Sequence, residues 1–137
     1  MQETKPIIYL DWITRDMLKA NPECIYVFGD NVTRKGLGGQ AAEMRGEQNA
    51  IGVATKRHPS STPFAFFHPD NDGDRVALES DLNRVVGYYL KGFQIYAPRA
   101  GLGTDRARLK EKAPELFNLI IDTFKQMSGE DFPWASL

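Results

Sequence analysis

The sequence predicts an α/β domain of three layers, in which helices cover both faces of a mixed, mostly parallel sheet. Short apolar runs alternate along the chain with segments of helical spacing, and two of these runs end in glycine-rich turns that precede a helix. Alternating strands and helices are typical of parallel sheets that are covered on both faces. The length of 137 residues suits one domain, so we assign residues 1–137 to a single domain.

Four apolar runs are the expected strands, at residues 7–10, 25–28, 50–54 and 93–97. A continuous apolar run is expected where a strand is buried on both faces. The expected helices are residues 15–20, with Thr14 as N-cap, and residues 39–45, 76–90 and 107–127. Pro114 fits the first turn of a regular helix that starts near Ala113.

Two segments have no regular spacing. Residues 56–74 are rich in Pro, Ser, Asp and Asn and contain several Phe residues, so either a short strand or an ordered flap is expected there. The tail, residues 128–137, carries Phe132 and Trp134, which we expect to dock on the core.

Composition and charge narrow the classes of function. A net charge of −1 provides no field to hold a polyanion, so nucleic acid is disfavoured as a partner. One cysteine and two histidines cannot form a classical zinc cluster, so no metal and no cofactor are expected, and Cys24 is expected to be a buried thiol. No run resembles a signal peptide or a membrane span, which favours a cytoplasmic protein without a membrane partner.

The two glycine-rich turns are the strongest functional signal. The first holds Gly36, Gly38 and Gly39, and the second holds Gly101 and Gly103 around Leu102, with Thr104 following. Glycines between a strand and a helix let backbone N–H groups approach an anion, so Gln40 and its neighbours are candidate ligand contacts. Two such loops could hold a diphosphate from both sides. Their spacing fits neither a Walker loop nor a Rossmann fingerprint.

Charged and polar residues also follow the strands. Asp30 and Asn31 come directly after Gly29, where they either contact a ligand or hold their own loop by an Asx turn. Lys56 and Arg57 follow the third strand, and a cation there neutralises phosphate or simply faces solvent. Asp105 is expected in the first turn of the last helix, where an acidic residue favours the helix dipole.

Four stretches, in this order, resemble a known family. They are Gly29-Asp30, Gly36-x-Gly38-Gly39, Thr55-Lys56-Arg57 and the segment from Pro98 to Arg106, which reads Pro-Arg-Ala-Gly-Leu-Gly-Thr-Asp-Arg. The chain resembles macro domains, the fold that binds ADP-ribose. It is most similar to the branch that includes the terminal ADP-ribose protein glycohydrolase and the ADP-ribose-1″-phosphate phosphatases. The resemblance covers about residues 25–127.

The resemblance implies a macro-domain fold and a role for each matching residue. Asp30 would contact the adenine, Gly38 and Gly39 would line one side of the diphosphate, and residues 101–104 would line the other. Lys56 matches the catalytic lysine that attacks the anomeric carbon of a linked ADP-ribose. Asp105 matches the aspartate that assists by proton transfer. These roles are chemically consistent, because a desolvated lysine is a nucleophile and a nearby carboxylate moves protons.

Three functions remain open at this point. The domain binds ADP-ribose or a related nucleotide and hydrolyses an ADP-ribosyl linkage, so that its partner is ADP-ribose or an ADP-ribosylated substrate. Alternatively, it is a non-catalytic reader or sponge for ADP-ribose or another NAD-derived signal. A third alternative is a small RNA-binding module, in which cations track phosphates: Arg34, Lys35, Arg45, Lys56 and Arg57. The sequence does not indicate an oligomeric state.

Overall fold

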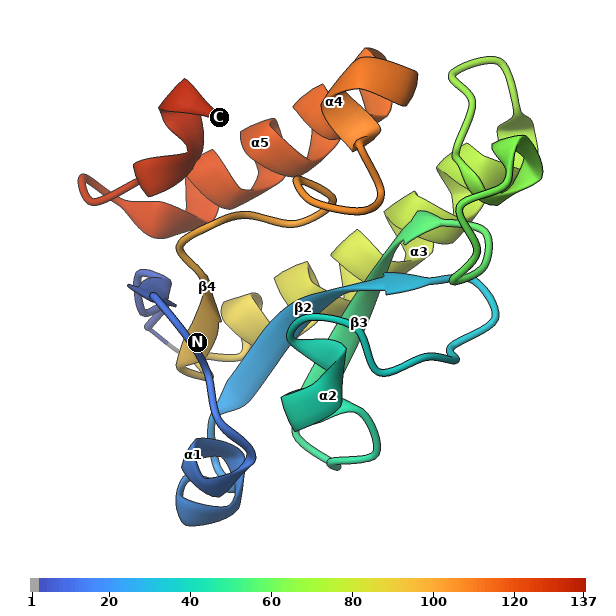
Figure 1. Cartoon of the computed structure of the whole chain (residues 1–137). Helices are drawn as coiled ribbons and strands as arrows, with labels where there is room; N and C mark the ends of the chain where they lie inside the picture. The colour runs from blue at the N-terminus through green and yellow to red at the C-terminus, as the bar shows by residue number, and fades with distance from the viewer. Residues whose placement is uncertain (1–2) are drawn as a thin grey trace.

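A four-stranded sheet lies between two layers of helices in the computed structural model, which describes residues 3–137 (Figure 1). The strands are β1 (Ile8–Leu10), β2 (Ile25–Asn31), β3 (Ala50–Lys56) and β4 (Ile95–Pro98). Their order across the sheet is β1-β4-β2-β3, and every pair is parallel. The α/β class is confirmed. The mixed sheet is corrected to a fully parallel one over the described residues.

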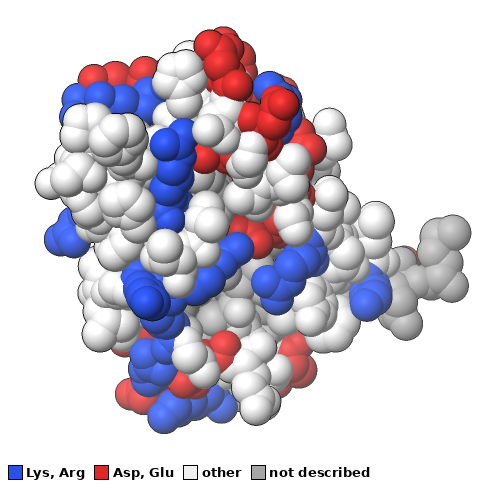
Figure 2. Space-filling view, turned by 90° about the vertical axis from the view of Figure 1, so that its right-hand side faces the viewer, with Lys and Arg blue, Asp and Glu red and all other residues white. Residues whose placement is uncertain are grey.

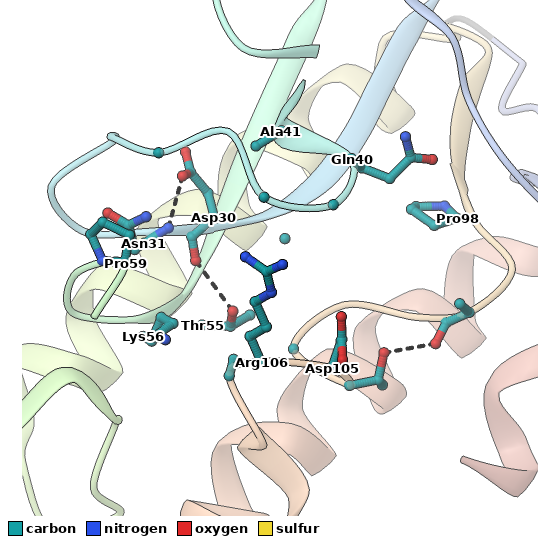
Figure 3. A pocket seen from close by; sticks show the side chains of 18 of the residues that line it. Asp30, Asn31, Gln40, Ala41, Thr55, Lys56, Pro59, Pro98, Asp105 and Arg106 are labelled. Atoms are coloured by element: carbon teal, nitrogen blue, oxygen red, sulfur yellow. Dashed lines mark hydrogen bonds between the residues drawn. The ribbon is translucent and has the colours of Figure 1, made fainter. Parts of the chain in front are cut away.

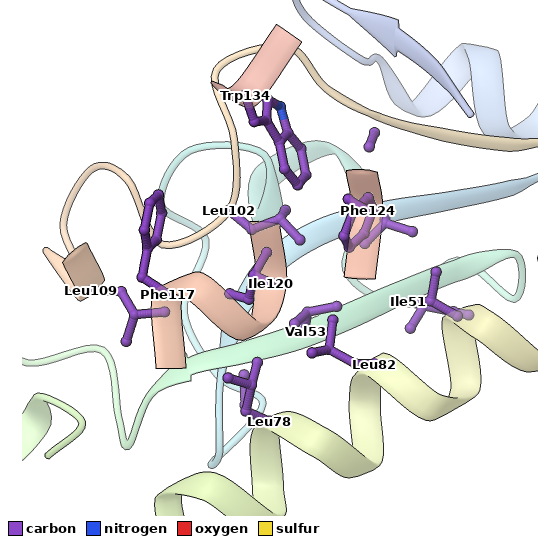
Figure 4. Packing of buried hydrophobic residues seen from close by; sticks show 14 of the residues in the cluster. Ile51, Val53, Leu78, Leu82, Leu102, Leu109, Phe117, Ile120, Phe124 and Trp134 are labelled. Carbon is purple, nitrogen blue, oxygen red and sulfur yellow. The ribbon is translucent and has the colours of Figure 1, made fainter. Parts of the chain in front are cut away.

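The alternation of side chains along the strands builds a hydrophobic cluster on each face of the sheet. Tyr26 and Phe28 of β2 point to one face, where they pack with α1 (Arg15–Ala20) and α2 (Ala41–Met44). Val27 of β2 and Ile51 and Val53 of β3 face the larger cluster, formed with α3 (Asp72–Leu90) and α5 (Pro114–Ser128) (Figure 4). The predicted three layers are therefore present.

Helices α1 and α3 begin at side-chain caps. The Thr14 hydroxyl accepts a hydrogen bond from the Met17 N–H, so α1 has the predicted bounds. The Asn71 carboxamide accepts one from the Asp74 N–H (3.0 Å), which starts α3 one turn before the predicted position. The prediction missed this first turn because its polar residues show no apolar periodicity.

The prediction of one long helix at residues 107–127 is wrong. The structure has α4 (Leu109–Lys112) and α5, separated at Ala113, whose φ of −148° and ψ of 71° are not helical. Pro114 disfavours the helical conformation in the preceding residue and cannot donate a backbone hydrogen bond. It occupies the first turn of α5, as predicted. Asp105 consequently lies in a turn ahead of α4, outside any helix.

The segment after β3 folds back on the end of that strand as an ordered flap. The Arg57 N–H donates to the Ala65 carbonyl (2.7 Å), and Lys56 and Phe66 form an antiparallel bridge. Between these contacts lies the short 3₁₀ helix η1 (Pro63–Ala65). This arrangement places the Phe66 ring beside Lys56.

The C-terminal tail docks on the core, as predicted. Trp134, in the 3₁₀ helix η2 (Pro133–Ser136), is 1% exposed and its indole N–H donates to the Pro98 carbonyl (3.0 Å). Its ring packs on Phe124 of α5 with the ring centroids 4.6 Å apart. The tail therefore braces the start of the second glycine-rich loop.

None of the helices in residues 3–137 is long and apolar enough to cross a membrane.

Candidate functional site

A cleft of about 250 Å³ lies at the carboxyl ends of β2, β3 and β4, where both glycine-rich loops meet (Figure 3). The second loop lies close against β2: a Cβ atom added to Gly29 of this strand would lie 3.4 Å from the Gly103 nitrogen. Ligands of parallel α/β sheets bind at this edge of the sheet. The structure thus brings together two motifs that are distant in the sequence.

Most residues singled out in the sequence line this cleft. They are Asp30, Asn31, Gly36, Gly38, Gly39, Gln40, Lys56, Gly101, Gly103, Thr104 and Asp105. Two others do not. Leu102 is 1% exposed and packs in the core, and the Arg57 guanidinium forms an ion pair with the Asp74 carboxylate (2.8 Å) outside the cleft.

Asp30 lies at the cleft, but its carboxylate is already occupied. One oxygen accepts from the Arg45 guanidinium (2.6 Å) and from the Asn31 N–H (2.8 Å). The other oxygen lies 3.3 Å from Arg45 and 3.5 Å from Arg34. The side chain is buried, so these contacts compensate for the loss of water around its charge. Asp30 therefore holds its own loop, the structural alternative that the sequence left open.

The first glycine-rich loop is fixed by the same network. Arg45 also donates to the carbonyls of Gly36 (2.7 Å) and Lys35 (3.2 Å). Arg34, in the left-handed conformation with φ of 57°, reaches past Asp30 and binds both carboxylate oxygens of Asp81 in α3 (2.8 and 2.7 Å). The loop is therefore shaped before any ligand arrives, which lowers the entropy cost of binding.

Backbone N–H groups of both loops remain available to a ligand. Within residues 3–137, those of Gly38, Gly39, Gly103 and Thr104 make no hydrogen bond. Helix α2, which was expected at residues 39–45, has only four residues and so adds little dipole. An anion at this side of the cleft would therefore be bound by the loop amides rather than by the N-terminus of α2.

Lys56 is a buried lysine at the end of β3. It is 8% exposed, its amine donates to the Ser60 carbonyl (2.8 Å), and the amine nitrogen lies 5.2 Å from the centroid of the Phe66 ring. Burial lowers the pKa of Lys56, and the nearby Arg106 cation lowers this pKa further. A lysine with a lowered pKa has a larger neutral, nucleophilic fraction at moderate pH.

Asp105 lines the cleft but is not joined to Lys56. The two side chains form no ion pair, and Figure 3 shows them on opposite sides of Arg106. Asp105 is exposed in the turn that precedes α4. Proton transfer between the two residues would therefore require the turn to move or a ligand or water to lie between them.

Arg106 is a residue whose role sequence reasoning missed. Its side chain crosses the cleft between the loops, so closely that a Cβ atom on Gly38 would lie 2.4 Å from a guanidinium nitrogen (Figure 3). The side chain is exposed and forms no hydrogen bond or ion pair with another residue in 3–137. The sequence shows only that an arginine follows Gly103 by three residues. This spacing does not predict that its side chain reaches the first loop.

Cations slightly outnumber carboxylates in the cleft. Its charged lining residues are four cations, Lys35, Arg45, Lys56 and Arg106, and three carboxylates, Asp11, Asp30 and Asp105, of which Asp30 is neutralised by two arginines. Figure 2 shows the side of the molecule toward which β2 points in Figure 1, and Lys and Arg side chains form a row across it. In the described part of the chain, no group of three His, Cys, Asp or Glu side chains is placed to hold a metal ion.

The structure is that of a parallel α/β protein with a cleft at the carboxyl ends of its strands. The chain belongs to a family of unknown function (DUF7831), whose model matches residues 8–123. Comparisons with curated proteins and with solved structures gave no match.

Proposed function

We propose that the cleft binds ADP-ribose or a related nucleotide, with the diphosphate between the two glycine-rich loops. The observation that carries this proposal is the position of Arg106, an unpaired cation flanked by the free N–H groups of both loops. A guanidinium together with convergent amides is the usual donor set for phosphate oxygens. The macro-domain resemblance of the four sequence stretches supports the choice of ADP-ribose.

We further propose that the protein hydrolyses an ADP-ribosyl linkage. The neutral amine of Lys56 attacks the anomeric carbon of the distal ribose, and the bond from that carbon to the linked group breaks. The linked glutamate departs as its carboxylate and takes the bonding electron pair. Water then attacks the anomeric carbon and breaks its bond to Lys56, while the Asp105 carboxylate accepts a proton from that water; ADP-ribose and the neutral amine are released, and Asp105 returns the proton to solvent. The burial of Lys56 and its lowered pKa support the first step.

The test is the release of ADP-ribose from a glutamate-linked ADP-ribosylated protein. Lys56→Ala should lower turnover by at least about 100-fold, because it removes the nucleophile, while calorimetry still detects ADP-ribose binding. Lys19→Ala is the matched control, since Lys19 is an exposed lysine of α1 that does not line the cleft. Full turnover by Lys56→Ala would refute the mechanism.

A second candidate is a reader that binds ADP-ribose without hydrolysing it. The observation that favours it is the separation of Lys56 from Asp105, together with the hydrogen bond that ties the Lys56 amine to Ser60. Binding of ADP-ribose with no release from any linked substrate would favour the reader.

The RNA-binding alternative has less support, because most of the cations it requires already have carboxylate partners. Arg34, Arg45 and Arg57 are each paired with a carboxylate, which leaves two of the five cations named for that function without such a pair.

A further inference from the structure

Trp12 is an exposed aromatic side chain at the cleft. It lies in the connection between β1 and α1, is 48% exposed, and is the one aromatic residue among those that line the cleft in the described part of the chain. Large apolar side chains on a surface are often found at binding sites when they border a polar cleft. No local sequence pattern marks this residue as part of the site, because the glycine-rich loops lie elsewhere in the chain.

The backbone on both sides of Trp12 is anchored. Before it, the Arg99 N–H donates to the Leu10 carbonyl (2.8 Å), and the Arg99 guanidinium pairs with Asp11 (3.2 Å). After it, the Gln40 side chain forms two hydrogen bonds with the backbone of Ile13, at 2.8 and 2.9 Å. The backbone that carries Trp12 is therefore fixed by Arg99 and Gln40, and the exposure of the indole does not come from a loose loop.

The occupied carboxylate of Asp30 raises the question of what contacts the base of a nucleotide. Both oxygens of Asp30 already contact Arg45, and the side chain is only 3% exposed, so Asp30 is poorly placed to accept from an adenine amino group. An exposed indole can hold a planar base by stacking. Asp11, the neighbour of Trp12 at the cleft, offers a carboxylate that can accept a hydrogen bond from the base.

We propose that Trp12 is the stacking platform for the nucleobase of the ligand. The ligand then runs from the base at Trp12, through its diphosphate at Arg106 and the glycine-rich loops, toward Lys56. Figure 3 shows the middle and far parts of this path: Gln40 and Pro98 lie on one side of Arg106, and Lys56 and Pro59 lie on the other. This inference rests on the proposed nucleotide binding and adds the residue that recognises the base.

The two tryptophans of the chain make the inference testable by fluorescence. Trp12 is exposed and Trp134 is buried at 1% exposure, so a ligand in the cleft changes the emission of Trp12 selectively. ADP-ribose and AMP should quench the emission of the unmodified protein, whereas pyrophosphate and ribose 5-phosphate, which carry no base, should not. Quenching by all four probes alike would contradict stacking.

Affinity measurements on variants separate this inference from the proposed function. Trp12→Ala should weaken ADP-ribose binding by about 10-fold or more while pyrophosphate binds as before, because only the base is affected. Trp12→Tyr, which retains an aromatic face, should recover most of the affinity. If Trp12→Ala and Trp12→Tyr both bind ADP-ribose as tightly as the unmodified protein does, the role of Trp12 is refuted and the nucleotide site stands. If ADP-ribose does not bind the unmodified protein, both proposals are refuted.

Discussion

At the scale of single residues, two cations in close proximity define the chemistry of the cleft. Lys56 is buried and held by Ser60 and Phe66, and Arg106 is exposed and unpaired within the described residues. Their mutual repulsion is relieved by an anion between them or by loss of the Lys56 proton. The same pair therefore favours both the binding of a phosphate and a neutral, nucleophilic lysine.

Removing the Arg106 side chain should weaken nucleotide binding. A hydrogen bond to a charged group contributes about 1.5–3 kcal/mol, so Arg106→Ala should raise the Kd for ADP-ribose by about 10- to 100-fold. Arg106→Lys keeps the charge but loses the fork of donors, and we expect an intermediate Kd. Calorimetry measures the Kd for ADP-ribose of the unmodified protein and of both variants. An unchanged Kd in Arg106→Ala would show that the guanidinium does not contact the ligand.

The pH dependence of turnover should depend on the same arginine. The rate should rise with pH as Lys56 loses its proton, and this rise should occur below the pH at which an exposed lysine titrates, because the pKa of Lys56 is lowered. In Arg106→Ala the nearby positive charge is gone, so the protonated amine is less disfavoured, its pKa increases and the rise moves to higher pH.

Arg106→Lys is the control for this pH profile, since it retains a cation at the same position. Its profile should stay close to that of the unmodified protein. If the rate of Arg106→Ala rises at the same pH as that of the unmodified protein, or at a lower pH, the coupling between Arg106 and Lys56 is contradicted.

At the scale of elements, the second glycine-rich loop requires a backbone that only glycine adopts readily. Gly103 has φ of +70°, and an added Cβ atom would lie 3.0 Å from Thr55 and 3.1 Å from Leu109. Its carbonyl also accepts a hydrogen bond from the Leu109 N–H (2.9 Å), so the loop and α4 are built as a unit. A side chain at this position would disturb the loop and the end of β3 together.

Gly103→Ala should therefore lower the free energy of unfolding, by about 1–3 kcal/mol. Gly87→Ala is the matched control, because Gly87 lies inside α3 with no atom within 4 Å of an added Cβ. Alanine favours the helix, so this variant should gain about 0.5–1 kcal/mol. Urea unfolding followed by circular dichroism gives both values. Equal effects of the two substitutions would show that the loop geometry does not require glycine at position 103.

Local patterns in the sequence predicted most of these elements but not the contacts between them. Helix α1 was predicted because Thr14 is a local cap, and the strands because their apolar runs are continuous. The break at Ala113 was missed because the apolar spacing continues across it. The pairing of Asp30 with Arg45, the crossing of Arg106 to Gly38 and the position of Trp12 depend on residues distant in the chain, which no local spacing encodes.

At the scale of the whole molecule, the parallel sheet brings the two loops together, and the layer that contains α3 and the docked tail holds both of them in place. The first loop is tied to α3 through Arg34 and Asp81, and the carboxylate of Asp81 also accepts from the Ala54 N–H (2.8 Å) at the open edge of β3. The second loop starts at Pro98, whose carbonyl is held by Trp134 of the tail. The cleft is therefore coupled to the stability of the whole domain.

Truncating Trp134 should show this coupling. Trp134→Ala should cost about 3–5 kcal/mol of unfolding free energy, since it empties a fully buried position between α5 and β4. Trp134→Phe keeps an apolar ring but leaves the Pro98 carbonyl without its donor, so we expect a smaller loss of about 1–3 kcal/mol. Chemical unfolding of both variants measures the difference, and a loss below 1 kcal/mol for Trp134→Ala would contradict the docking of the tail.

The central claim is that this cleft binds ADP-ribose, and its most direct test is a calorimetric titration of the unmodified protein with ADP-ribose, AMP and NAD. We expect one-to-one binding of ADP-ribose that is tighter than the binding of AMP or NAD and is weakened by Arg106→Ala. If ADP-ribose shows no binding, or if Arg106→Ala binds it unchanged, the site between the two glycine-rich loops is not a site for this nucleotide.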